Sequence, residues 1–265
     1  MGKPGNLRRP SEWAFVLPSA VLLSLLALPL LALIGRAALD GMLGYATAPA
    51  AVAALRLSLT TSLVSLLITI LTGTPLAFVL ARRQFTGKAA VELLIDLPVV
   101  LPPSVAGIAL LIAFGRQGMF GSALAAIGIT LPFTTAAVVL AQTFVSAPFF
   151  VRAARIGFAA VDIQLQEAAY VEGSSEWQLF RRVMFPLAQR AILSGAVLAW
   201  TRALGEFGAT ILFAGNMPGV TQTMPLAIYL GLERGLGVAL ALSFILVVVS
   251  VSLLLVMRSL ERPEH

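Results

Sequence analysis

The sequence predicts an all-α integral membrane protein with six transmembrane helices, and its composition is the first reason. Hydrophobic residues make up 59% of the 265 residues and charged residues only 11%, whereas about a quarter of the residues in a soluble domain are charged. A soluble domain of this size leaves most side chains partly in water, so it could not hide so much apolar surface. The apolar residues also form long uninterrupted runs, whereas the strands of an outer-membrane barrel alternate polar and apolar positions.

Six of these runs are long enough to cross a bilayer, which needs a helix of about 20 mostly apolar residues. They cover residues 13–35, 57–81, 97–115, about 134–151, 191–214 and 235–257. The first is longer than the apolar segment of a signal peptide, about 7–15 residues, so we expect a retained helix. The Gly-rich stretch 117–132 indicates a loop or a short re-entrant helix. Because the chain has no linker or low-complexity tract, we expect residues 1–265 to form a single transmembrane domain.

The basic residues predict which side of the membrane each loop occupies. With six spans, both termini lie on one side, and cytoplasmic segments carry the excess of Lys and Arg. If the termini are cytoplasmic, four of the 18 basic residues lie at the outer boundary, namely Arg36, Arg56, Arg116 and Arg234. Thirteen then lie inside, namely Lys3, Arg8, Arg9, Arg82, Arg83, Lys88, Arg152, Arg155, Arg181, Arg182, Arg190, Arg258 and Arg262. This bias predicts that both termini are in the cytoplasm.

The sequence also excludes several kinds of chemistry. There is no cysteine and the single histidine is His265, so thiolate sites, disulfides and buried histidine bases are excluded. No GxxxxGK[ST] phosphate-binding loop occurs, so we expect that this chain does not hydrolyse ATP and binds no cofactor of its own. The spans lack the series of Asp, Glu and His residues typical of proton-coupled pumps. We see no internal repeat of the kind found in many secondary transporters.

The longest cytoplasmic connection, residues 152–190, is predicted to form two short helices with a bend between them. Residues 161–171 have helical composition. Gly173 follows, and glycine after a helix commonly takes the left-handed conformation that ends it. Ser174 is expected to cap the second helix, with Glu176 in its first turn.

The second helix is predicted to carry an apolar face that leads into the membrane. Trp177, Phe180 and Met184 recur at helical spacing. Pro186 marks the entry to the fifth span, because proline is well tolerated in the first turn of a helix. Two helices of this kind on the cytoplasmic side can dock into a groove on another protein.

This segment resembles the EAA motif in the permease subunits of ABC importers. The family pattern is Glu-Ala-Ala, three residues, Gly, nine residues and then Ile-x-Leu-Pro. The chain has EAA at 167–169, Gly173 and VMFP at 183–186, so every spacing agrees. Val183 replaces Ile and Phe185 replaces Leu, and both keep the position apolar. EAA alone is common in helices, so the resemblance depends on the full spacing.

The resemblance implies that residues about 156–186 couple the membrane domain to ATPase subunits. The residues implicated in this coupling are Asp162, Glu167, Ala168, Ala169, Gly173, Trp177 and Pro186. It further implies a homodimer, two cytoplasmic ATP-binding cassette subunits that hold ATP and Mg²⁺, and an extracytoplasmic oxyanion-binding protein. The expected location is the inner (plasma) membrane.

Three more segments narrow the resemblance to permeases for molybdate, tungstate and sulfate. They are DLPVVLPPSVAG at 96–107, RALGEFGATILFAGN at 202–216 and QTMPLAIY at 222–229. The sequence GEFGAT followed by FAGN is more similar to molybdate than to sulfate permeases. The alternatives are a sulfate or thiosulfate permease and, from other classes, an ion-coupled secondary transporter or channel, or a membrane-embedded enzyme.

Two charges within the fifth predicted span need a structural explanation. Arg202 and Glu206 are four residues apart, so they are expected to share a helix face and to pair, because an isolated charge in hydrocarbon costs at least about 2.5 kcal/mol. Gly205 and Gly208 flank Glu206 and are expected to let a neighbouring helix approach closely. The pair either locks two helices together or forms part of a translocation pathway or gate.

Proline residues are expected to break the third predicted span. Pro98, Pro102 and Pro103 each lack a backbone donor, and Ser104 follows at the break. Free carbonyl groups in a membrane must be satisfied by protein or by water. The break is therefore either a static kink or a feature that shapes the translocation pathway, in which Pro102, Pro103 and Ser104 would take part.

Overall fold

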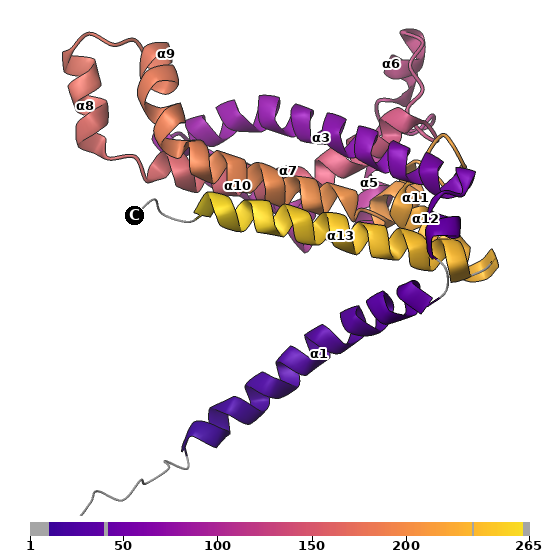
Figure 1. The fold of residues 1–265 in the computed structure, drawn as a ribbon. Coiled ribbons are helices and arrows are strands. Elements are labelled where there is room, and N and C mark those ends of the chain that lie inside the picture. The colour runs from indigo at the N-terminus through magenta and orange to yellow at the C-terminus, as the bar shows by residue number, and fades with distance from the viewer. Residues whose placement is uncertain (1–10, 40–41, 235, 262–265) are drawn as a thin grey trace, which may run out of the picture.

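The computed structural model describes residues 11–39, 42–234 and 236–261, and in these ranges every regular element is helical (Figure 1). The helices are α1 (Ser11–Leu39), α2 (Met42–Ala46), α3 (Pro49–Arg82), α4 (Lys88–Val100), α5 (Pro103–Phe114), α6 (Gly121–Ala126), α7 (Thr135–Ala159), α8 (Ile163–Val171), α9 (Glu176–Leu179), a π-helical turn (Phe180–Met184), α10 (Phe185–Leu204), α11 (Gly208–Phe213), α12 (Met224–Arg234) and α13 (Leu236–Glu261).

Five helical segments of the described chain are long and apolar enough to cross a membrane. They are Phe15–Arg36, Pro49–Arg82, Thr135–Ala159, Glu176–Leu204 and Leu236–Ser259. A sixth span results if the bent pair α4 and α5 is counted as one. The predicted all-α, multi-span fold class is therefore confirmed, while the count of six, the orientation and the single domain stay predictions. Among the residues used for the orientation, Lys3, Arg8, Arg9 and Arg262 lie outside the described residues, as does His265.

The third span is not the single helix predicted at residues 97–115. Its first part, α4, already begins at Lys88, and α4 and α5 meet at an angle of 120°. Leu101 and Pro102 are extended, with ψ of 135° at both residues. The cause is the predicted one: a proline disfavours the helical conformation in the residue before it and cannot donate a backbone hydrogen bond.

The fifth span also differs from the prediction of one helix over residues 191–214. The helix starts earlier, because α9, the π-helical turn and α10 are continuous from Glu176 to Leu204. It then stops, and residues 205–207 separate it from the short helix α11. The helix α12 was not predicted, because its 11 residues are too few for a span.

Helices α3, α7 and α10 form the centre of the bundle (Figure 1). Glycine allows them to approach closely: a Cβ atom on Gly73 of α3 would lie 2.8 Å from Phe150 of α7, and one on Gly195 of α10 would lie 2.7 Å from Ala153 of α7. Serine hydroxyls on α3 add hydrogen bonds, since Ser62 Oγ accepts from Trp200 Nε1 at 3.0 Å. The three helices therefore form a rigid frame for the remaining elements.

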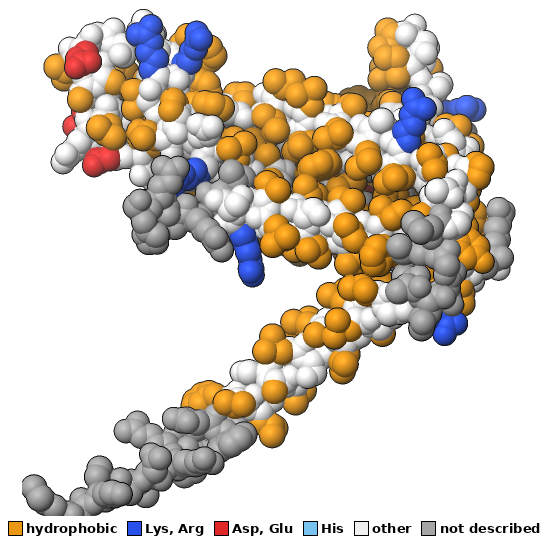
Figure 2. Space-filling view, in the orientation of Figure 1, with side chains coloured by type: hydrophobic (Ala, Val, Ile, Leu, Met, Phe, Trp, Pro, Cys, Tyr) orange, Lys and Arg blue, Asp and Glu red, His pale blue; other side chains and the backbone are white. Residues whose placement is uncertain are grey.

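The surface agrees with a protein that lies in a bilayer. Apolar side chains cover the visible sides of the bundle and of α1, and the acidic side chains that can be seen are at the end formed by α8 and α9 (Figure 2). Helix α1 diverges from the bundle, and none of its apolar window Phe15–Arg36 is buried (Figure 1). The helix α6 projects from the end of the bundle opposite to α8 (Figure 1).

Candidate functional site

The loop that carries the EAA motif begins with a well-capped helix. The Asp162 side chain accepts a hydrogen bond from the backbone N–H of Gln164 at 2.9 Å, which caps α8. Gly173 has φ of +83°, which confirms the predicted left-handed stop. The predicted cap at Ser174 is wrong. The N–H of Ser174 bonds back to the Ala169 carbonyl at 2.9 Å and so closes α8, and Ser175 is the residue that caps α9.

The second short helix is not a separate element. Ser175 and Gln178 form a reciprocal capping box, and Glu176 lies in the first turn as predicted. The helix then runs without interruption into the membrane, through a π-helical turn and past Pro186, which lies at the start of α10. The loop is thus directly continuous with a transmembrane helix.

The predicted apolar face anchors this helix to the bundle. Met184 is fully buried, and Phe180 packs edge-on against Phe78 of α3, with ring centroids 5.0 Å apart. Phe158 of α7 is 6.0 Å from the same ring. Trp177 stacks on Phe180 at 5.5 Å but is 66% exposed. The face therefore exists, and Trp177 forms its outer, solvent-facing edge.

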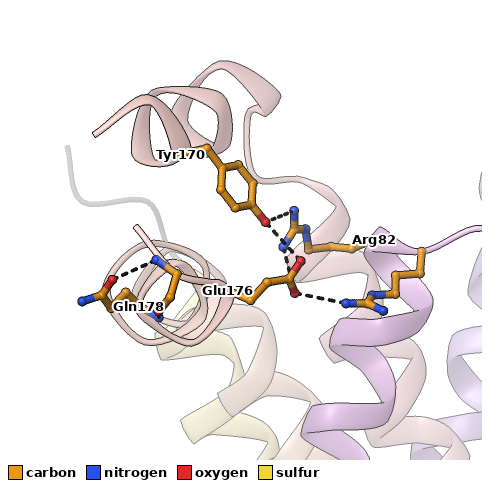
Figure 3. A network of polar contacts seen from close by, with 6 residues as sticks. Arg82, Tyr170, Glu176 and Gln178 are labelled. Carbon is orange, nitrogen blue, oxygen red and sulfur yellow. Dashed lines mark hydrogen bonds and ion pairs between the residues drawn. The ribbon is translucent and has the colours of Figure 1, made fainter. Parts of the chain in front are cut away.

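A polar network around Arg82 fixes the loop to the end of α3 (Figure 3). Arg82 Nη2 donates to the Tyr170 hydroxyl at 3.0 Å, and that hydroxyl donates to Glu176 Oε1 at 3.3 Å. Arg83 Nη2 lies 3.4 Å from Glu176 Oε2. Exposed pairs of this kind contribute about 0–1 kcal/mol each, and here they join Tyr170 of α8 and Glu176 of α9 to the end of α3. This network could not be predicted from the sequence, because Arg82 and Glu176 are far apart in the chain.

The rest of the loop surface is available for a partner. Glu167 and Ala168 are exposed, whereas Ala169 is buried on the inner side of α8. Apolar side chains stand beside them, namely Ile163, Leu165, Val171 and Trp177, each between 49% and 88% exposed. Exposed apolar side chains gathered in one place, with polar groups between them, are typical of a protein interaction surface.

The two interrupted spans meet within the bundle. A Cβ atom on Gly208, at the start of α11, would lie 2.7 Å from Pro103 Cβ and 3.3 Å from Ser104 N, at the start of α5. A Cβ atom on Gly107 of α5 would lie 2.9 Å from the Ala209 carbonyl oxygen of α11. The prediction that Gly208 permits a close approach is confirmed. The segment that approaches Gly208 is the start of α5, next to the predicted break at Pro102 and Pro103.

The predicted ion pair between Arg202 and Glu206 is present. Arg202 Nη1 is 2.7 Å from Glu206 Oε2, and the side chains are 28% and 1% exposed. The predicted shared helix face is wrong, because α10 ends at Leu204 and Glu206 lies in the break. Glu206 Oε1 also accepts from the backbone N–H of Ala209 at 2.8 Å. The carboxylate therefore joins the end of α10 to the beginning of α11.

Gly205 does not mediate the close approach that was predicted. It is exposed, and a Cβ atom there would find only the Thr201 carbonyl oxygen, at 3.7 Å. The break in the fifth span is consequently tight on the side of Gly208 and open on the side of Gly205.

The family of the chain follows from comparison with known proteins. A family model described as "Binding-protein-dependent transport system inner membrane component" matches residues 73–263. The chain belongs to this family. It is therefore a multi-pass inner-membrane component of a transport system, and the resemblance to ABC-importer permeases is confirmed.

Individual relatives are similar over most of the chain. The "Molybdenum transport system permease protein ModB" of Mycobacterium tuberculosis is 42% identical over 246 residues, covering 93% of this chain and 92% of the relative. The "Probable transport system permease protein NifC" of Clostridium pasteurianum is 44% identical over 204 residues, covering 76% and 71%. The "Probable sulfate transport system permease protein cysT" of Chlorokybus atmophyticus is 38% identical over 226 residues, covering 84% and 79%.

Solved structures support the fold. The crystal structure of a bacterial alginate ABC transporter, in complex with an alginate pentasaccharide-bound periplasmic protein, contains a chain that matches with a TM-score of 0.77 at 20% identity, covering 94% of this chain and 93% of that one. A chain of the MetNI methionine ABC transporter in an inward-facing conformation matches with a TM-score of 0.57 at 18% identity, covering 88% and 99%. At these identities the likeness concerns the fold alone.

Proposed function

We propose that this chain is the permease subunit of an ATP-driven importer for a tetrahedral oxyanion, molybdate or tungstate, and that two copies together form the pathway. The observation that carries this proposal is the 42% identity to a molybdenum permease over nearly the full length of both chains. The segments at 96–107 and 202–216, which first suggested this group, supply the two breaks that meet at Gly208 and Pro103.

In this proposal the surface of α8 receives an ATPase subunit. Glu167 and Ala168, with the exposed apolar side chains around them, form the contact, and Gly173 provides the turn between α8 and α9. Each of the two ATPase subunits would hold ATP and Mg²⁺, so that this chain itself needs no cofactor. An extracytoplasmic binding protein would deliver the oxyanion at the opposite end of the bundle.

The continuous helix from Glu176 to Leu204 suggests how ATP hydrolysis reaches the pathway. Its 29 residues have a length of about 43 Å at 1.5 Å per residue. One end carries Glu176, which is bound to Arg82 and Arg83, and the other ends at the open break beside Gly205. A rigid helix of this length would convert a movement of α8 into a movement of Arg202 and Glu206 relative to α5.

Substrate-stimulated ATP hydrolysis tests the proposal. The complex of this chain with its ATPase subunits is reconstituted with the binding protein, and molybdate, tungstate or sulfate is added. We expect molybdate and tungstate to stimulate hydrolysis and sulfate not to do so. Stimulation by sulfate or thiosulfate instead would favour the alternative supported by the 38% identity to a sulfate permease. A lack of stimulation by any oxyanion would refute both.

A further inference from the structure

The guanidinium group of Arg202 has an unoccupied side. Within the described part of the chain, Glu206 is its single acceptor, through Nη1. The Arg202 side chain is nevertheless 28% exposed, and no Arg202 nitrogen is among the buried side-chain atoms of the described residues that lack a partner, so its remaining N–H groups are open to water or to an anion. A guanidinium has five N–H donors in a planar fork, and one edge can bind a carboxylate while another binds a second oxyanion.

In Glu206, by contrast, both carboxylate oxygens have a partner and the side chain is buried. One carboxylate oxygen pairs with Arg202 and the other accepts the N–H of Ala209, and the side chain is 1% exposed. The carboxylate is therefore held in place and shielded, while the charge that faces the open side is the positive one. The Glu206 carboxylate offsets part of the Arg202 charge, so an anion on the open edge of the guanidinium would be held only weakly.

The open side of Arg202 lies at membrane depth. Trp200, two residues earlier in α10, donates to Ser62 Oγ of α3. Ser62 is 13 residues after Pro49 and 20 before Arg82, hence about 20 Å and 30 Å from the ends of α3. A hydrocarbon core of about 30 Å, centred on this helix, would include that level.

Neither Arg202 nor the break beside it can face lipid. A charged group at this depth faces protein or a water-filled cavity, because exposure to hydrocarbon is costly. Interrupted backbone in a membrane is subject to the same restriction, since its free carbonyl groups need partners. Gly205 is exposed, and a Cβ atom there would make only an ordinary contact, with the Thr201 carbonyl oxygen at 3.7 Å. The guanidinium and the helix break therefore lie on a side of the bundle that must be covered by protein or by water, as a pathway between two copies of the chain would be.

We propose that the open edge of Arg202, together with the break at Gly205, forms a weak relay site that an oxyanion contacts during passage through the permease. The free N–H groups donate to two oxygens of the tetrahedral anion, and Glu206 keeps the contact short-lived by offsetting the charge. Weak binding suits a pathway, because an ion must be able to leave each site. The identity of the anion rests on the proposed function, whereas the aqueous, anion-attracting character of the site does not.

Cysteine labelling tests this inference directly, because the natural chain has no cysteine. Gly205→Cys places one thiol in the open break, where a Cβ atom has room. Ala203→Cys, two residues earlier at the end of α10, is the matched control, since Ala203 is 1% exposed. The assembled complex is treated with the anionic sulfonatoethyl and the cationic trimethylammonioethyl methanethiosulfonate, and each rate is divided by the rate of that reagent with a free thiol.

We expect Gly205→Cys to react at least about tenfold faster than Ala203→Cys, and faster with the anionic than with the cationic reagent, since a positive potential concentrates anions. Adding the changes Arg202→Gln and Glu206→Gln should abolish the preference for the anionic reagent. Millimolar molybdate should slow labelling of Gly205→Cys while the arginine is present. The glutamine at 206 can still accept from Ala209, so the break keeps that hydrogen bond.

Three results would overturn the relay site: equal labelling of the two cysteines, equal rates for the two reagents, or a preference that survives removal of the charges. The complex of two permease and two ATPase subunits with the binding protein could transport no molybdate and still show the anion preference, with its loss on Arg202→Gln and Glu206→Gln. In that case the proposed substrate is wrong and the anion site stands. If molybdate is transported and labelling shows no preference, the proposed function stands and the relay site is refuted.

Discussion

The contact between the two interrupted spans makes a sharp prediction for Gly208→Ala. The added methyl group would lie 2.7 Å from Pro103 Cβ and 3.3 Å from both Pro103 C and Ser104 N. Optimal separations between carbon atoms are about 3.5–4.0 Å, so α5 and α11 must move apart by close to 1 Å. Overpacking of this kind costs about 1–3 kcal/mol, and both neighbours are backbone or proline ring atoms that cannot rotate away.

The matched control is Gly205→Ala, three residues earlier, in the break that precedes α11. Its methyl group would meet only the Thr201 carbonyl oxygen at 3.7 Å, and the φ of −85° suits alanine. Thermal unfolding of the two variants in detergent, followed by tryptophan fluorescence, measures the difference. We expect Gly208→Ala to lower the free energy of unfolding by about 1–3 kcal/mol and Gly205→Ala to leave it unchanged or slightly higher. Equal stability of the two variants would show that α5 and α11 are not packed at this contact.

Three further predictions concern the loop and the ion pair. Gly173→Val should reduce substrate-stimulated ATP hydrolysis about 5–30-fold, because a left-handed conformation costs an L-residue about 1–2 kcal/mol, whereas Gly173→Asn should retain most of it; equal rates in the two variants would refute the turn's role. Glu167→Lys should reduce co-purification of the ATPase subunit, and undiminished recovery would remove Glu167 from the contact. Arg202→Gln and Glu206→Gln should each reduce folded yield more than the double variant, since each strands one charge; additive losses would show that the two side chains do not interact in the protein.

Local and periodic signals in the sequence were enough to predict most of the fold. Hydropathy located the long helices, Pro102 and Pro103 predicted the break in the third span, and Gly173 predicted the turn in the loop. Each of these features depends on the residue itself or on its immediate neighbours, as with the missing donor of proline or the freedom of glycine at positive φ.

The partners in contacts between distant residues were not predicted. Leu204 ends α10 in the middle of an apolar run, and the tertiary contact of Gly208 with Pro103 accompanies that break. The anchoring of Glu176 by Arg82 requires the end of α3 to lie beside α9. No local pattern encodes such a contact, because the two partners are brought together only by the packing of α3 against α7 and α10.

The proposed function requires that this chain moves an oxyanion with energy from ATP hydrolysed on partner subunits. The most direct test is the accumulation of radioactive molybdate inside sealed proteoliposomes that contain this chain and its ATPase subunits, with the binding protein outside and ATP inside. We predict accumulation above the external concentration that requires all three components and stops when ATP is replaced by a non-hydrolysable analogue. Accumulation that is driven by an ion gradient in liposomes containing this chain alone, without ATPase or ATP, would contradict the account.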